Sequence, residues 1–182
     1  FSHDIDGILE IYGNDACAQR LKAILPIVGQ SMMDAMRAHY NEVAAFSPFE
    51  TQGYRVTPLK ALHNRAENCL IYLIEKDGKS LLYANDTGLF PQETWEYLRG
   101  KKLDLVSMDC TMQQIPEGTN HMGLTDNAEL CRRLGEAGCT HEGTKYVITH
   151  FSHNGGLLHE ELEERARPLG FLTAYDGMTL SF

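Results

Sequence analysis

Histidine and aspartate side chains follow several apolar runs of this sequence, at positions where buried strands would end. They are His63 after residues 56–59, Asp86 after 81–84, Asp109 after 105–108, and His150 and His153 after 146–149. In layered α/β proteins, the loops that follow strands are the usual place for ligands and catalytic groups. Imidazoles and carboxylates gathered there would suit Zn²⁺, Mn²⁺ or Fe. The pattern therefore indicates a candidate metal site.

Each of these residues also has an ordinary structural interpretation. A single histidine such as His63 is most often a loop or surface residue, and turns favour a sequence such as Asp86-Thr87-Gly88. Two histidines spaced like His150 and His153 occur by chance in many proteins. Four further histidines have no such setting and are expected on the surface or in helices: His3, His39, His141 and His159. From the residue pattern alone, both interpretations stay open.

The elements that would position these residues alternate between strands and helices. Strands are predicted at 54–59, 103–108, 146–149 and 171–182. Three helices are predicted: one at 91–99, one that begins with Thr125 as its N-cap, and one at 157–167. Two apolar runs, 69–74 and 80–84, flank Asp77-Gly78, which is a strong signal for a β-hairpin. Pro91 suits the first turn of its helix, where a missing N–H costs nothing. The alternation favours one domain built as a layered α/β sandwich.

The segment before residue 48 has a helical pattern. Apolar residues recur at steps of three and four from Asn14 to about Tyr40, as one face of a helix requires. Pro26 lies inside this run and is expected to split or kink it. Met32, Met33 and Met36 favour core packing over a cofactor site. Ordinary core packing fits this segment best. Two other roles stay open: it covers the candidate site, or it forms the interface of a homodimer.

Composition and charge restrict the partners. The formal net charge of −9 argues against a chain that coats long nucleic acid. It permits a small anionic substrate, because bound divalent cations invert the local field. No apolar stretch approaches the ~20 residues that cross a bilayer, so no membrane association is expected. Five widely spaced cysteines without a C-x-x-C pair favour free thiols and a cytoplasmic location.

Six short motifs in residues 53–182 resemble the metallo-β-lactamase superfamily. The resemblance is strongest to its phosphodiesterase branch, typified by the cyclic ribose phosphodiesterase of bacterial phosphonate breakdown. The motifs are Val56-Thr57-Pro58-Leu59 with His63, Asn85-Asp86-Thr87-Gly88-Leu89, Val106-Ser107-Met108-Asp109-Cys110, Asn120-His121, Ile148-Thr149-His150-Phe151-Ser152-His153, and Tyr175-Asp176-Gly177-Met178. The resemblance implies an αββα sandwich, here mainly its C-terminal portion, with 14–48 as a helical insert.

The resemblance also implies roles for individual residues. His63, Asp86 and His150 correspond to metal ligands, and Asp86 to the residue that bridges two divalent ions, Zn or Mn or else Fe. His121 corresponds to a catalytic histidine, not a ligand, that acts on the scissile phosphate or the leaving oxygen. For Asp109 and Asp176, which match family positions, structural roles are expected. The implied function is a metal-dependent hydrolase, a phosphodiesterase that uses a hydroxide bridging the metals.

One departure from the family bears on this function. The signature H-x-H-x-D-H does not occur in the sequence, and we expect the chain to begin after it, leaving the site of these 182 residues incomplete. The expected partner is a small anionic substrate, and among such substrates a phosphodiester is expected. Two alternatives stay open: another hydrolase of the superfamily, acting on an ester, lactone, thioester or RNA end, and a catalytically silent binding module.

Overall fold

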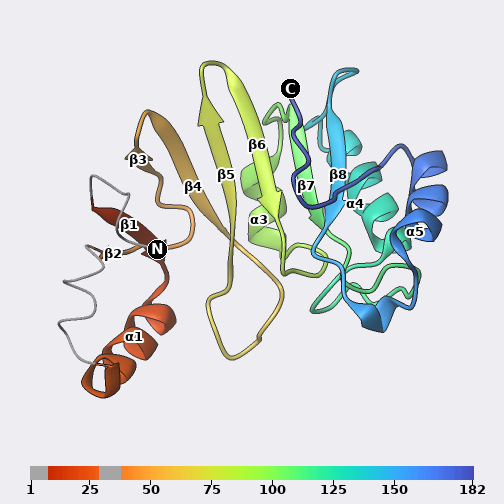
Figure 1. Cartoon of the computed structure of the whole chain (residues 1–182). Helices are drawn as coiled ribbons and strands as arrows, with labels where there is room; N and C mark the ends of the chain where they lie inside the picture. Colours follow the sequence, from red (N-terminus) through yellow and green to blue (C-terminus); the bar gives the residue numbers. More distant parts are fainter. Residues whose placement is uncertain (1–7, 29–37) are drawn as a thin grey trace.

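A seven-stranded sheet forms the centre of the protein, in a computed structural model that describes residues 8–28 and 38–182. The strands follow one another in sequence order: β3 (Phe49–Thr51), β4 (Tyr54–Lys60), β5 (Leu70–Lys76), β6 (Lys79–Ala84), β7 (Leu105–Asp109), β8 (Lys145–Thr149) and β9 (Leu172–Thr173). β3 to β6 pair antiparallel and β6 to β9 pair parallel. The sheet is therefore mixed, with its parallel half toward the C-terminus (Figure 1).

The predicted hairpin joins the two halves of the sheet. β5 and β6 pair antiparallel across Asp77-Gly78, and both turn residues have positive φ, 50° at Asp77 and 77° at Gly78. Two left-handed residues are what a type I′ turn requires, and its twist matches that of the flanking strands. The sequence prediction of this hairpin is confirmed.

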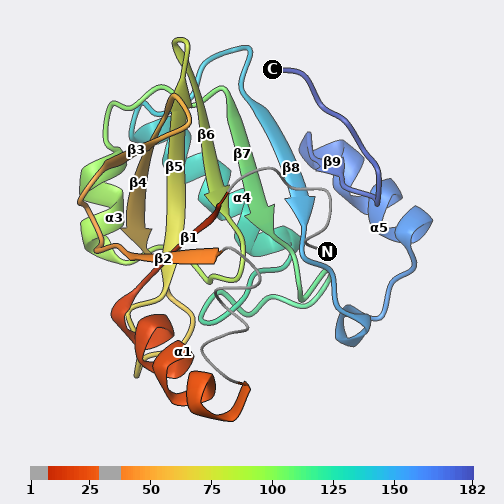
Figure 2. The same ribbon diagram turned by 60° about the vertical axis from the view of Figure 1, so that its left-hand side comes forward.

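Helices connect the parallel strands and cover one face of the sheet. They are α3 (Gln92–Leu98) between β6 and β7, α4 (Leu124–Glu136) between β7 and β8, and α5 (His159–Ala166) between β8 and β9. Two views show α3 and α4 behind the same face of the sheet (Figures 1 and 2). Because parallel neighbours need such crossovers, β6, β7 and β8 all end at one edge of the sheet. The loops after them are thereby brought together.

The core lies between this face and the helices. Alternate strand residues point into it, among them Leu82, Met108 and Ile148, which are fully buried. They pack in one cluster with Leu130 and Leu134 of α4. Full burial of each such side chain contributes about 1.5–3 kcal/mol relative to exposure. This packing holds the strand ends, and the loops that follow them, in fixed relative positions.

A smaller unit precedes the main sheet. β1 (Leu9–Gly13) and β2 (Ala38–Glu42) pair parallel, with α1 (Asp15–Val28) following β1. The ring of Tyr12 stacks on Phe49 of β3 at a centroid distance of 4.5 Å, and its hydroxyl donates to Thr51 at 3.0 Å. The unit lies on the side of the sheet opposite the helices (Figure 2).

The predicted helix from Asn14 to about Tyr40 is wrong at its C-terminal end. α1 ends at Val28 and runs through Pro26, while Tyr40 pairs with Ile11 in a parallel ladder. The apolar spacing that includes Tyr40 is compatible with a helix, and only the distant partner strand selects the extended form. The predicted core residues Met32, Met33 and Met36 lie outside the described residues.

Smaller predictions differ as well. Gly123, not Thr125, is the N-cap of α4, because its amide donates to Asp126 and a Cβ there would lie 2.3 Å from the Ile115 carbonyl oxygen. Pro91 is likewise the N-cap of α3. Of the strand predicted over 171–182, only β9 forms, since the chain turns at Gly177, whose φ is 87°. Among the described residues, no helix has the length and apolar character to cross a membrane.

Candidate metal centre

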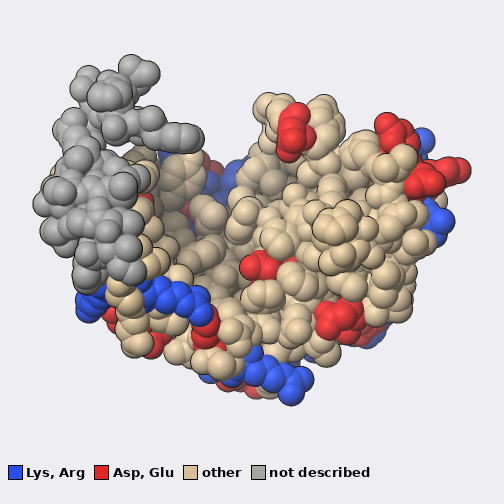
Figure 3. Space-filling view, turned by 60° about the horizontal axis from the view of Figure 1, so that its bottom comes forward, with Lys and Arg blue, Asp and Glu red and all other residues tan. Residues whose placement is uncertain are grey.

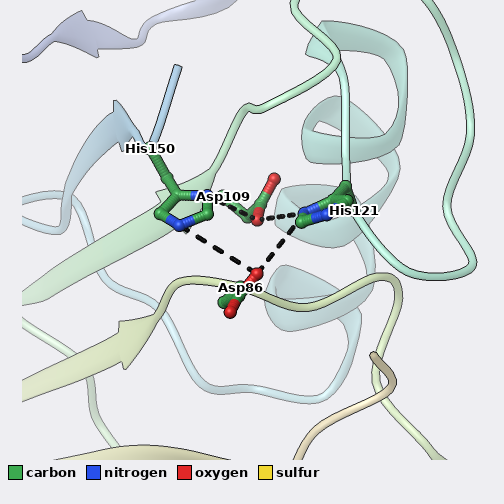
Figure 4. Close-up of side chains that lie close together, drawn as sticks. All are labelled: Asp86, Asp109, His121 and His150. Atoms are coloured by element: carbon green, nitrogen blue, oxygen red, sulfur yellow. Dashed lines mark hydrogen bonds and ion pairs between the residues drawn. The ribbon is translucent and has the colours of Figure 1, made fainter. Parts of the chain in front are cut away.

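Four side chains with metal-binding atoms meet where the parallel strands end. Asp86 follows β6, Asp109 is the last residue of β7, and His150 follows β8. His121 comes from the loop between β7 and α4. One ligand atom from each lies within 4.8 Å of all the others (Figure 4). Because β6, β7 and β8 are parallel neighbours that end at the same side of the sheet, residues 64 positions apart in the sequence, from 86 to 150, come together.

One carboxylate oxygen is the common point of the site. Asp86 Oδ1 lies 3.6 Å from His63 Nε2, 3.6 Å from His121 Nδ1 and 4.0 Å from His150 Nε2. These separations are too long for hydrogen bonds. Two ligands that are each ~2.1 Å from a tetrahedral ion are about 3.4 Å apart, close to the shorter of these distances. The donor set and its spacing therefore fit a divalent cation.

The backbone is left-handed at two of these residues. φ is 58° at Asp86 and 63° at His150, in a region that few non-glycine residues adopt. Such conformations cost about 1–3 kcal/mol and are kept where the surroundings enforce them, often at functional sites. Each turns its chain sharply at the strand end.

Thr111 determines which nitrogen of His150 faces the site. The Thr111 hydroxyl lies 2.9 Å from the backbone carbonyl of His150 and 2.8 Å from its Nδ1. A hydroxyl has one hydrogen, and the carbonyl can only accept it. The hydroxyl must then accept from Nδ1–H. In the neutral ring, Nε2 consequently carries the lone pair, and it is this nitrogen that faces Asp86.

His63 has the same arrangement with a different partner. Its Nδ1 lies 3.0 Å from the backbone carbonyl oxygen of Asn120, which is only an acceptor, so Nδ1 carries the proton. Nε2 is left with the lone pair and faces Asp86. Histidines that bind metals commonly donate their second N–H in this way, which fixes tautomer and ring orientation. Nε2 of His63 and Nε2 of His150 therefore both face Asp86 Oδ1 with a lone pair that a metal ion could use.

Asp109 is fully buried and holds the remaining histidine. Its Oδ1 accepts from the amides of Thr111 at 2.9 Å and Met122 at 3.1 Å. Its Oδ2 accepts from Nδ1 of His121 at 3.0 Å and lies 3.4 Å from Nδ1 of His150. The nitrogen of His121 nearest to Asp86 is thus already bonded to a carboxylate. This separates His121 from His63 and His150.

The loops of the site are bonded to one another. The amide of Leu62 donates to Thr87 Oγ1 at 3.0 Å, and the amide of Gly88 donates to the Leu62 carbonyl at 2.7 Å. A Cβ at Gly88 would lie 2.4 Å from the Thr119 carbonyl oxygen, so only glycine fits this approach. The loops that carry His63, Asp86 and His121 therefore form one packed layer.

Two groups near the site have shifted pKa values. Burial raises the pKa of the Cys110 thiol to about 12, helped by the charge of Asp109, so the thiol stays protonated at neutral pH and belongs to the core. Burial also opposes ionisation of Glu117, but hydrogen bonds from the Thr119 hydroxyl and from three backbone amides outweigh it and lower the pKa to about 2. Glu117 is therefore a carboxylate under all ordinary conditions.

Three predicted residues are not among the four grouped side chains. His63 lies outside the group although its Nε2 is 3.6 Å from Asp86 Oδ1, and His153 and Asp176 are exposed. Sequence reasoning missed Thr111, Glu117 and Gln113, all of which support the site. Gln113 is 3% exposed and clamps the loop after β8, donating to the Ser152 carbonyl and accepting from the Leu157 amide. For Thr111, the position two residues after Asp109 is the one feature of the sequence that pointed to the site.

A hollow of about 400 Å³ opens beside the site. His63 and Asp86 line it together with residues of the β1–α1 unit and of β5, including Tyr12, Cys17 and Tyr72. Seen from the end of the molecule where the parallel strands finish, the surface is hollowed, and an acidic side chain lies near the centre of the view (Figure 3).

Comparison with known proteins identifies the class. Residues 3–171 match the family model described as the β-lactamase superfamily domain, so the chain belongs to this family. No curated protein matches the sequence. Solved structures show that the fold is the mixed α/β fold of metallo-β-lactamases, which confirms the predicted fold class.

Three solved structures illustrate the likeness. YhfI of Bacillus subtilis, a metallo-β-lactamase fold protein, has 19% identity and a TM-score of 0.64, over 94% of this chain and 64% of its own. Zn²⁺-bound PqqB of Methylobacterium extorquens has 17% identity and a TM-score of 0.72, over 96% and 65%. Isothiocyanate hydrolase from Delia radicum gut bacteria has 13% identity and a TM-score of 0.62, over 96% and 67%. This chain thus spans about two thirds of the length of these proteins.

Family and site together support the coarser part of the predicted function. The superfamily consists of metal-dependent hydrolases, and this chain has their fold and a candidate metal-binding group. One of the similar structures, PqqB of Methylobacterium extorquens, is described with bound Zn²⁺.

Proposed function

We propose that this chain contributes His63, Asp86 and His150 to the metal site of a phosphodiesterase. One observation carries the proposal. Nε2 of His63 and Nε2 of His150 both face Oδ1 of Asp86, while their Nδ1 atoms are held by Asn120 and Thr111. Surface histidines seldom have both nitrogens constrained in this way, whereas metal ligands commonly do. We also propose two bound divalent ions, zinc or manganese or else iron, as the family resemblance implies.

A divalent cation in this site would supply a Lewis acid and a water of lowered pKa. The residues of the chain orient the reactants around it. Asp86 and the Nε2 atoms of His63 and His150 supply the ligand atoms. The buried carboxylate of Asp109 bonds to Thr111, Met122 and His121, and so keeps the loop between β7 and α4 and the His121 ring in place.

His121 is the proposed proton donor. Its Nδ1–H donates to Asp109 at 3.0 Å, so the proton that passes to a leaving oxygen is the one that Nε2 carries when the ring is an imidazolium. A base or acid oriented by a third group is the usual arrangement in enzymes that transfer protons. Hydrolysis of a phosphodiester expels an alkoxide that needs such a proton. Carboxylic esters and lactones expel one as well, so the choice of a phosphodiester rests on the resemblance of His121 to the histidine of the phosphodiesterase branch. The hollow beside His63 and Asp86 would accept the rest of the substrate.

Single-residue variants of the full-length protein test these roles. We expect His121→Ala to retain metal and to lower turnover of a phosphodiester with an alkyl-alcohol leaving group by about 10²–10⁴-fold, the usual contribution of general acid catalysis. Turnover of bis(p-nitrophenyl) phosphate should fall much less, because its leaving phenolate needs no proton. We expect His63→Ala to lose metal and activity together. His159→Ala, at an exposed histidine outside the cluster, is the matched control and should change neither.

Other outcomes contradict particular parts of the proposal. Loss of metal in His121→Ala would make this histidine a ligand. Cleavage of carboxylic esters, lactones or thioesters without cleavage of phosphodiesters would assign another hydrolase activity. Metal binding without any turnover would indicate a binding module.

A further inference from the structure

A single carboxylate organises the loop between β7 and α4. Oε2 of Glu117 accepts from the amides of Thr119 at 3.2 Å, Asn120 at 2.9 Å and His121 at 2.8 Å, and Oε1 accepts from the Thr119 hydroxyl. The amide of Glu117 itself donates to Asp126 of α4 at 2.9 Å. The loop is therefore wound around one side chain and tied to the helix that follows.

The peptide group between Asn120 and His121 connects this carboxylate to the site. A trans peptide is planar, and its N–H and C=O point in opposite directions. On one side, the His121 amide donates to Glu117 at 2.8 Å. On the other side, the Asn120 carbonyl accepts from Nδ1 of His63 at 3.0 Å. The orientation of the His63 ring is thus set by a peptide plane that Glu117 holds.

The same bonds fix the second histidine. His121 begins at the amide that Glu117 binds, and its ring extends to Asp109 and Asp86. The loop also accepts the amide of Leu89 at the Gly118 carbonyl, at 2.9 Å, next to the segment that carries Asp86. Residues on three sides of the site therefore depend on the loop that Glu117 shapes.

We propose that Glu117 is a positioning residue that holds His63 and His121 in the metal site through the peptide group joining Asn120 to His121. The inference rests on the proposed function of that site. The negative charge of Glu117 adds to the geometric effect, because a charge-assisted bond to the N–H polarises the peptide and makes its carbonyl a stronger acceptor. A stronger bond to Nδ1–H raises the basicity of His63 Nε2 as a ligand.

The test compares Glu117→Ala, Glu117→Gln and Glu142→Ala in the full-length protein. Glu142 is an exposed glutamate on the loop before β8, and no hydrogen bond or ion pair of its side chain occurs among the described residues, so it is the matched control. Two quantities are measured for each variant. The first is the dissociation constant of Zn²⁺ by chelator competition. The second is the imidazole ¹H–¹⁵N spectrum of the metal-free protein, which reports the tautomer of each histidine.

We expect Glu117→Ala to weaken zinc binding by about 10–100-fold, the usual effect of removing a group that supports a metal ligand. The Nδ1–H signal of His63 should disappear or broaden. Glu117→Gln keeps one acceptor oxygen without the charge and should fall between Ala and the wild type. The proposal is overturned if Glu117→Ala keeps the zinc affinity and the His63 signal of Glu142→Ala. If the wild type binds no zinc, the spectrum alone still decides whether Glu117 orients His63.

Discussion

Thr111→Val isolates the contribution of one hydroxyl to the site. The substitution keeps the shape of a side chain that is 9% exposed and removes the group that bonds both Nδ1 and the carbonyl of His150. In the variant, the imidazole of His150 lacks this hydrogen bond, so its orientation must be fixed at the moment the metal binds. A net hydrogen bond contributes about 0.5–1.5 kcal/mol, and about 1.4 kcal/mol corresponds to tenfold in affinity. We therefore expect binding of Zn²⁺ to weaken by about 2- to 12-fold.

The assay is zinc titration against a chromophoric chelator at fixed pH, with Thr111→Ser as the control. Serine retains the hydroxyl and should stay within about threefold of the wild type, since only a methyl group is lost. Equal affinities for Thr111→Val and Thr111→Ser, in proteins with matching thermal unfolding, would show that the hydroxyl does not orient His150.

Three further predictions concern the support of the site. Gly88→Ala should cost about 1–3 kcal/mol of unfolding free energy by chemical denaturation, because its Cβ meets a backbone oxygen at 2.4 Å, whereas Gly135→Ala, in open helix surroundings, should be neutral or stabilising. Asp109→Asn should weaken zinc binding by about 10–100-fold in the same titration, and unchanged affinity would refute its supporting role. The pKa of Glu117 is lowered from 4.5 to about 2, so its contribution to stability is present above 4.5 and is lost as the pH falls through about 2. The difference in unfolding temperature between wild type and Glu117→Gln should accordingly shrink on acidification, and a constant difference would contradict this.

Local patterns in the sequence predicted most of the main sheet. The Asp77-Gly78 turn and the apolar runs before Asp86 and His150 depend on neighbouring residues, so periodicity and turn chemistry suffice to find them. β2 could not be predicted in this way, because Tyr40 takes its conformation from Ile11, which is distant in sequence. A parallel partner leaves no local signature.

The candidate site could be predicted only in part, for a similar reason. Strand ends indicated where polar side chains gather, and the family resemblance selected among them. Thr111 and Glu117 act through bonds to the backbone of other residues, His150 in one case and the amides of 119–121 in the other. Any threonine or glutamate in a loop looks the same in a sequence. Only the folded loops show which of them orient a histidine.

Metal content of the full-length protein, measured by elemental analysis after purification without chelators, tests the central claim most directly. His63 and His150 both face Asp86, and the family resemblance implies two ions, so the proposal predicts about two equivalents of a transition metal, as in two-metal hydrolases, together with cleavage of bis(p-nitrophenyl) phosphate. A folded protein that contains no metal, takes up none when zinc is added and cleaves no phosphodiester would contradict the account.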